Sequence, residues 1–161
     1  EGTSIIAAEK EEKLLETLPR ELVDVAKGFK EYLSVIPESK IAMEVGVSAM
    51  HDVTEGGVFG ALWELGEASG VGITAHLDKI PIKQETIEVC EVFKINPYML
   101  ISSGSMMIGC EKGNLLVEKL EEAGINAAVI GRATEGNDRI VVSRDETRYI
   151  GPAGSDELYK I

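Results

Sequence analysis

Apolar residues recur at helical spacing through the first third of the chain. A charged, leucine-bearing run from Glu9 to about Leu18 predicts one helix. Pro19 and Pro37 stand where a first-turn proline is tolerated, so each predicts the start of a further helix, the second ending near Gly46. The apolar stripe expected on the helix after Pro19 consists of Leu22, Val25, Ala26, Phe29 and Leu33.

The pattern then changes from helical spacing to strands that alternate with helices. Residues 47–53 predict a short strand, residues 54–57 a glycine turn, and residues 58–69 a helix. Apolar and polar residues alternate from Val71 to Leu77, which indicates a half-buried strand. A helix is expected over residues 81–93.

The last third predicts three more strands and one helix. Residues 106–110 read as a strand, and the apolar positions before Gly124 predict a helix. Residues 125–133 and 139–143 flank a turn-rich segment, so we expect them to pair as a hairpin. Residues 149–161 predict a tail or an edge strand. Strands separated by helices favour an α+β domain, with helices packed against a mixed β-sheet.

Composition narrows the possible functions. The 161 residues, 44% of them hydrophobic, suffice for one domain, and the net charge of −12 opposes binding to nucleic acid or to an anionic membrane. Cys90 and Cys110 lack metal-binding or disulfide-framework spacing, which favours buried thiols in a cytoplasmic protein. The sequence has no initiator Met and opens in a predicted helix, so we interpret it as a piece of a larger protein.

Polar residues that could bind a ligand or a metal ion cluster where the strand at 47–53 meets the following helix. A helix N-terminus presents unpaired amides to anions, and Gly56 and Gly57 would let a phosphate approach the backbone. Thr54 could give its hydroxyl to that phosphate or cap the helix, and Glu55 could belong to the site or complement the helix dipole. Asp52, at the strand end, could hold Mg²⁺. A tight structural turn is the alternative.

Neighbouring residues have structural interpretations of their own. His51 adjoins the candidate site, and we expect it to be a structural histidine. Phe59 and Trp63 share a face of the helix that is distinct from its aliphatic stripe, so both faces are expected to be covered. The cover is either this domain itself or a missing domain.

The segment Ala49-Met50-His51-Asp52-Val53-Thr54-Glu55-Gly56-Gly57-Val58 resembles a motif of hydrogenase expression/formation proteins. Related forms occur in selenophosphate synthetase, thiamine monophosphate kinase and aminoimidazole ribonucleotide synthase. The likeness continues through the opening Glu1-Gly2-Thr3, then Ile80-Pro81-Ile82, Ile95-Asn96-Pro97-Tyr98 and Ile130-Gly131-Arg132. The chain is thus similar to the C-terminal domain of that superfamily over nearly its whole length.

The resemblance implies a two-domain enzyme that dimerises through its N-terminal domains and holds ATP and Mg²⁺ in the cleft between domains. Residues 1–161 would be the C-terminal domain alone, without the ATP-binding N-terminal domain. By the same resemblance Asp52 is similar to a Mg²⁺-binding aspartate, and Thr54, Gly56 and Gly57 match the turn facing the phosphates. Phosphoryl transfer to a small-molecule or protein acceptor is the implied reaction.

Two differences from the family pattern bear on the substrate. Hydrogenase expression/formation proteins end in a cysteine, whereas residues 154–161 contain none. Ser102-Ser103-Gly104 stands where the family has Asn-Glu-Gly. These differences favour a paralogue acting on another small substrate over a hydrogenase maturation factor. The alternative is a non-catalytic binding or scaffold domain of the same fold.

Overall fold

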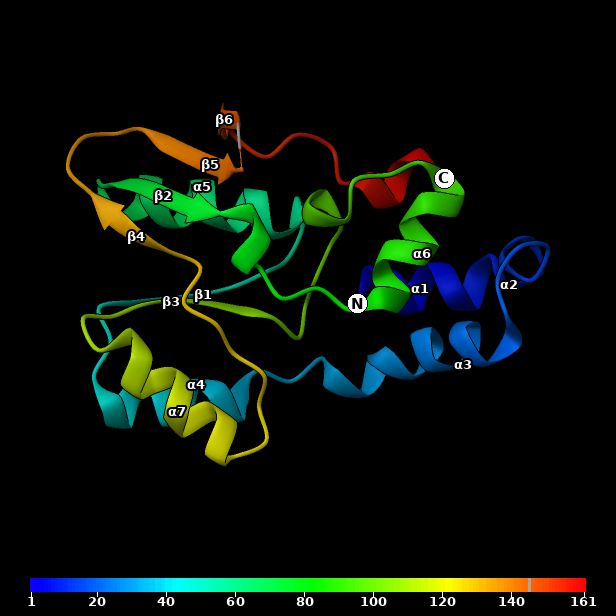
Figure 1. Cartoon of the computed structure of the whole chain (residues 1–161), viewed down its shortest axis with the longest axis horizontal. Coiled ribbons are helices and arrows are strands. Elements are labelled where there is room, and N and C mark those ends of the chain that lie inside the picture. Colours follow the sequence, from blue (N-terminus) through cyan, green and yellow to red (C-terminus); the bar gives the residue numbers. More distant parts are fainter. Residues whose placement is uncertain (145) are drawn as a thin grey trace.

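The structure is a computed structural model, which describes residues 1–144 and 146–161 (Figure 1). The α-helices are α1 (Gly2–Glu9), α2 (Glu11–Leu14), α3 (Arg20–Gly28), α4 (Ile36–Val45), α5 (Gly57–Ser69), α6 (Gln84–Phe93) and α7 (Gly113–Glu122). The strands are β1 (Ala49–Asp52), β2 (Gly72–His76), β3 (Met106–Gly109), β4 (Gly131–Thr134), β5 (Arg139–Ser143) and β6 (Glu146–Tyr149). Short 3₁₀ helices are η1 (Phe29–Tyr32), η2 (Leu77–Lys79), η3 (Pro97–Met99) and η4 (Glu157–Lys160).

A four-stranded mixed sheet with the order β4-β2-β5-β6 forms one layer of the fold. Strand β2 pairs parallel with β5 and antiparallel with β4, and β5 pairs antiparallel with β6. Helix α5 lies behind this sheet in Figure 1. Leu62 of α5, Ile73 and Ala75 of β2, and Val141 of β5 form the apolar core between helix and sheet. The N-terminus of α5 is therefore held on a packed scaffold.

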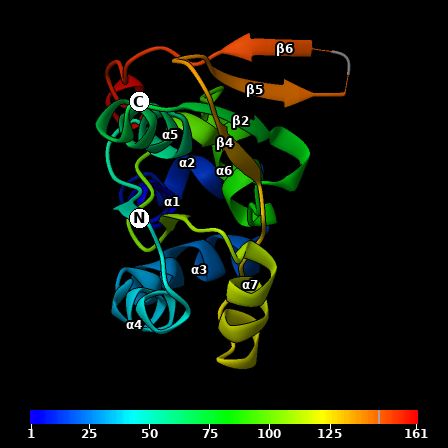
Figure 2. The same ribbon diagram turned by 90° about the vertical axis from the view of Figure 1, so that its left-hand side faces the viewer.

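A second, two-stranded sheet pairs β1 antiparallel with β3, with Asp52 opposite Met106. Helices α4 and α7 pack together beside this ribbon (Figures 1 and 2). Their core contains Ala42, Leu116 and Leu120, with Ile108 of β3 packed against it. Because β1 leads directly into the turn before α5, this ribbon positions the chain segment that enters the candidate site.

The remaining helices, α1, α2, α3 and α6, build a third core. Its fully buried side chains include Ile6, Leu14, Val23 and Val89. The two ends of the chain meet here, because Leu158 in η4 and Ile161 pack against the same cluster as α1. Figure 1 shows η4, in red, beside α6. The C-terminal segment is thus part of the packed structure.

The α+β class with helices against a mixed sheet is confirmed, and one strand pairing is wrong. The expected hairpin between residues 125–133 and 139–143 does not form, because β2 lies between β4 and β5 and pairs with both. Of the first segment only residues 131–133 are in a strand, β4, which ends at Thr134. The hairpin partner of β5 is β6, an edge strand from which the chain continues as a tail.

Two details of the helical third also differ from expectation. The run from Glu9 to Leu18 is divided between α1 and α2, which break at Lys10. On α3 the buried side chains are Val23 and Ala26, whereas Val25 is 50% exposed. The helix rotates its inward face by about one position, because α1 and α6 contact it from that side. Within the described residues, every helix is too short or too polar to cross a membrane.

Candidate phosphate-binding turn

The strand, turn and helix predicted around the candidate site are present. Strand β1 ends at Asp52, Gly56 is the residue before α5, and the helix begins at Gly57. Both glycines are left-handed, with φ of 80° and 61°, a conformation that costs other residues about 1–2 kcal/mol. The amide of Gly57 donates to the Thr54 carbonyl at 3.1 Å. The sequence therefore places two glycines where the backbone requires them.

The space beside each glycine is filled by other parts of the chain. A Cβ on Gly56 would lie 2.8 Å from the Cβ of Ala153. A Cβ on Gly57 would lie 2.7 Å from the carbonyl oxygens of both Tyr98 and Leu100. Such separations are far below a normal contact. The absence of side chains at these positions thus allows close internal packing in this conformation.

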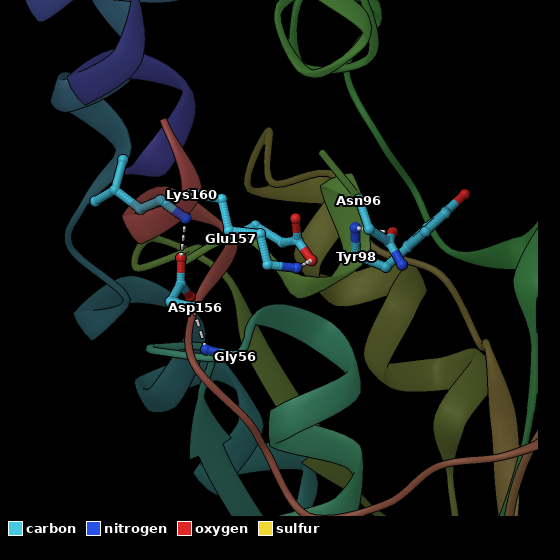
Figure 3. A network of polar contacts seen from close by, with 7 residues as sticks. Gly56, Asn96, Tyr98, Asp156, Glu157 and Lys160 are labelled. Carbon is cyan, nitrogen blue, oxygen red and sulfur yellow. Dashed lines mark hydrogen bonds and ion pairs between the residues drawn. The ribbon is translucent and has the colours of Figure 1, made fainter. Parts of the chain in front are cut away.

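A carboxylate already occupies the N-terminus of α5. The amide of Gly56 donates to Oδ2 of Asp156 at 2.7 Å, and the bond is buried. The other carboxylate oxygen of Asp156 accepts from the Leu158 amide at 2.9 Å, which caps η4. Figure 3 shows Asp156 reaching Gly56 from the C-terminal segment. The turn therefore binds an anion, and that anion is the chain's own side chain.

Thr54 and Glu55 have different surroundings. Thr54 is half-buried and makes no side-chain capping bond to α5 among the described residues, so of its two suggested roles the helix cap is not observed. Glu55 is exposed, and its Oε1 accepts from the Tyr159 hydroxyl at 2.7 Å. This hydrogen bond, together with the negative charge of Glu55, raises the pKa of Tyr159. Glu55 is therefore a second point at which the C-terminal segment contacts the turn.

Asp52 presents its carboxylate to solvent beside the turn. Its side chain is 60% exposed, and Oδ1 lies 3.9 Å from Nδ1 of His51. His51 itself points to α5, where Nε2 lies 2.9 Å from Oε2 of Glu64, so it links strand to helix as expected of a structural histidine. Across residues 1–144 and 146–161, no three His, Cys, Asp or Glu side chains gather as a metal-binding group. Asp52 is therefore an exposed carboxylate beside the turn that belongs to no such group.

A cavity of about 450 Å³ adjoins the turn. Gly56, Phe59 and Gly60 line it from α5, Tyr98 from η3, and Ala153 from the C-terminal segment. The rings of Phe59 and Tyr98 stack with their centroids 5.5 Å apart and their planes 11° apart. The volume falls within the range typical of small-ligand pockets.

The second aromatic residue of α5 is also covered by this domain. The guanidinium of Arg139, on β5, lies 5.5 Å from the centre of the Trp63 ring, and Arg139 pairs with Glu67 at 2.9 Å. Phe59, on the same helix as Trp63, stacks on Tyr98 of η3. The aromatic face of α5 is therefore contacted by the domain itself, one of the two alternatives left open by the sequence.

Sequence reasoning missed the residues that close the turn. Asp156, Ala153 and Tyr159 lie about a hundred positions beyond Gly56, and no local pattern connects the two segments. An aspartate directly before a short helical turn indicates a cap for that turn, and Asp156 is such a cap for η4. Its second hydrogen bond, to Gly56, has no counterpart in the local sequence.

Comparison with known proteins places this geometry in a family. Residues 1–143 match the family described as "AIR synthase related protein, C-terminal domain". The chain belongs to this family. A hydrogenase expression/formation protein of Methanocaldococcus jannaschii is 33% identical over 153 residues, which cover 88% of this chain and 45% of the relative. The phosphoribosylformylglycinamidine synthase subunit PurL of Salinibacter ruber is 27% identical, over 94% of this chain and 20% of the relative.

Solved structures share the fold. The crystal structure of HypE, a hydrogenase maturation protein of E. coli, superposes with a TM-score of 0.69 at 23% identity, covering 78% of this chain and 41% of that one. HypE in complex with ATP gives a TM-score of 0.65 at 20% identity, over 74% and 40% of the two chains. The 161-residue chain thus spans less than half the length of these relatives.

Proposed function

We propose that this chain is the C-terminal domain of an ATP-dependent phosphoryl-transfer enzyme and supplies one wall of an interdomain site. The family match over residues 1–143 is the observation that carries the proposal, together with relatives that are more than twice as long. HypE, which shares the fold, has been solved with ATP. A domain lacking in this chain provides the rest of the nucleotide site, and the longer protein forms a homodimer through that domain.

Asp52 is the proposed Mg²⁺ ligand. Its exposed carboxylate would fit a hard cation such as Mg²⁺, whose other protein ligands would come from outside this chain. When bound there, Mg²⁺ would supply positive charge to the phosphates. Asp52 positions the cation beside the turn, since β1 leads from it directly into the residues before α5.

The turn of Thr54, Glu55, Gly56 and Gly57 is the proposed phosphate-facing surface. Among the described residues, the amides of Val58 and Phe59 have no hydrogen-bond partner. These two donors at the start of α5, with the positive end of the helix dipole, favour an anion. Glu55 lies at the edge of this surface and adds a negative charge to it. No covalent nucleophile from this domain is required.

A second candidate function is a binding or scaffold domain that keeps the fold without catalysis. The observation in its favour is the filled turn, because Asp156 and Ala153 occupy the space that a phosphate would need at Gly56. On this alternative the two glycines serve packing alone, and the longer protein has no affinity for Mg-ATP.

The test compares Asp52→Asn with Asp24→Asn in the longer protein. Asp24 is an exposed aspartate on α3, so its variant controls for the loss of one surface charge. We expect Asp52→Asn to reduce Mg²⁺-dependent ATP turnover at least about tenfold, with an unfolding free energy within about 0.5 kcal/mol of the parent. Asp24→Asn should leave both unchanged. Unchanged turnover in Asp52→Asn removes this residue from the site.

A further inference from the structure

The C-terminal segment contacts the turn through its first half and the helical core through its second. Residues 151–155 are exposed, whereas Asp156 and Glu157 are 2% and 4% exposed. Leu158 and Ile161 pack on the core shared by α1, α3 and α6. The segment is thus a strap that crosses from the β-sheet to the helical core over the start of α5 (Figures 1 and 3).

Asp156 and a phosphate need the same donor. The Gly56 amide is the hydrogen-bond donor of the left-handed turn that faces the strap, and Oδ2 of Asp156 accepts from it in a buried contact. A phosphate oxygen at this amide would have to replace the carboxylate. Two anions held side by side would also repel each other strongly in this buried position. A phosphate at the free amides of Val58 and Phe59 can therefore also bind the Gly56 amide only after Asp156 has left it.

We propose that residues 151–161 form an autoinhibitory strap, whose Asp156 carboxylate must leave the Gly56 amide before a phosphate ligand binds. The inference rests on the proposed phosphate-facing role of the turn and adds the regulation of that site. The ligand class is a phosphate group presented with its oxygens toward the N-terminus of α5.

The arrangement of the strap allows such a release. The Ile150 amide donates to the Arg139 carbonyl at 2.8 Å, which anchors the start of the strap to β5. Gly151 and Gly154 follow, and neither has an atom near the position of a Cβ. Rotation at these glycines would withdraw Asp156 while leaving the sheet intact. The hydrophobic contacts of Leu158 and Ile161 hold the strap closed in the absence of a ligand.

Release would also open the cavity beside the turn. The Cβ of Ala153 lies 2.8 Å from where a Cβ on Gly56 would be and 3.4 Å from where one on Gly60 would be. The same alanine, with Gly151 and Pro152, lines the cavity of about 450 Å³. One movement of the strap therefore exposes the amide and widens the adjoining space, which links anion binding to ligand access.

The test measures the affinity of inorganic phosphate for the longer protein, in its parent form and as the Asp156→Asn and Glu157→Gln variants. Asparagine keeps the shape and capping oxygen of Asp156 but removes the charge. Glu157 is the matched control, because it is the adjacent buried acid and pairs with Lys160 instead of the turn. We expect Asp156→Asn to bind phosphate about tenfold more tightly than the parent, as the loss of a charge-assisted hydrogen bond implies, and Glu157→Gln to match the parent.

Any other outcome contradicts the proposed autoinhibitory role of the strap. Equal phosphate affinity in all three proteins means that Asp156 does not compete, although the phosphate-binding turn itself survives. If none of them binds phosphate, both the phosphate-binding role of the turn and the inhibitory role of Asp156 are contradicted. Circular dichroism checks that each variant is folded.

Hydrogen exchange of the unmutated chain provides a readout that needs no variant. The Leu158 amide is protected by Oδ1 of Asp156, so saturating phosphate should accelerate its exchange as the strap leaves. The amides of β2 should remain unchanged as an internal reference. Unaltered exchange at Leu158 in phosphate-bound protein overturns the proposal.

Discussion

Replacing Gly57 by alanine should destabilise the protein more than the same replacement at Gly70. Gly57 begins α5 and Gly70 follows its end, and both are left-handed, with φ of 61° and 64°. Their surroundings differ. A Cβ on Gly57 would lie 2.7 Å from the Tyr98 and Leu100 carbonyl oxygens, whereas nothing lies within 4 Å of one on Gly70. The pair therefore separates backbone strain from steric exclusion.

The expected magnitudes follow from this difference. At Gly70 the left-handed alanine costs about 1–2 kcal/mol, partly offset by about 0.4–1 kcal/mol from the stiffer unfolded chain. At Gly57 the same terms apply, and the backbone around Leu100 must also move, which adds about 1–3 kcal/mol as overpacking commonly does. We expect a net loss near 1 kcal/mol at Gly70 and about 2–4 kcal/mol at Gly57.

Urea unfolding of the parent and both variants, followed by far-UV circular dichroism, measures these free energies. Equal slopes m are required, so that the midpoints report stability alone. Losses that agree within about 0.5 kcal/mol would contradict the close approach of η3 to the turn. A smaller loss at Gly57 than at Gly70 would refute the packing of the glycine turn altogether.

Further predictions concern substitutions at Cys90, Glu55 and Arg139. Burial raises the pKa of the Cys90 thiol to about 12, well above its usual range. The folded state therefore loses stability as pH rises from about 9 towards 12, by about 1 kcal/mol at pH 10, and Cys90→Ala should flatten that part of the pH–stability curve measured by urea unfolding. The hydrogen bond to Glu55 raises the pKa of Tyr159, so ultraviolet titration of Glu55→Gln should show one tyrosine ionising at lower pH than in the parent; identical curves would contradict the contact. Arg139→Ala should cost about 1–2 kcal/mol and change the fluorescence of Trp63, the single tryptophan; an unchanged spectrum would contradict their stacking.

Local sequence sufficed for the elements that carry the candidate site. The glycine pair before an apolar helix predicts the turn, because few other residues adopt positive φ there. Alternation from Val71 to Leu77 predicts β2. In each case the decisive interaction is within a few residues of the pattern, and the family resemblance of residues 49–58 agrees with the match over 1–143.

Long-range pairing lay beyond that reasoning. Strand β2 inserts between β4 and β5, although the turn-rich residues 134–138 predict a direct hairpin. The insertion depends on burying Ile73 and Ala75 of β2 under α5, a packing choice that no hairpin signal contains. For the same reason, the bond from Gly56 to Asp156 joins segments that the sequence leaves unrelated.

The proposed interdomain site is tested most directly by calorimetric titration of Mg-ATP. The two samples are the 161-residue chain and the longer protein with the additional half that its relatives carry. The account predicts binding by the longer protein, with little or none by the chain alone, because this domain supplies one carboxylate and one turn. Absence of binding by a folded longer protein would contradict it and favour the scaffold function.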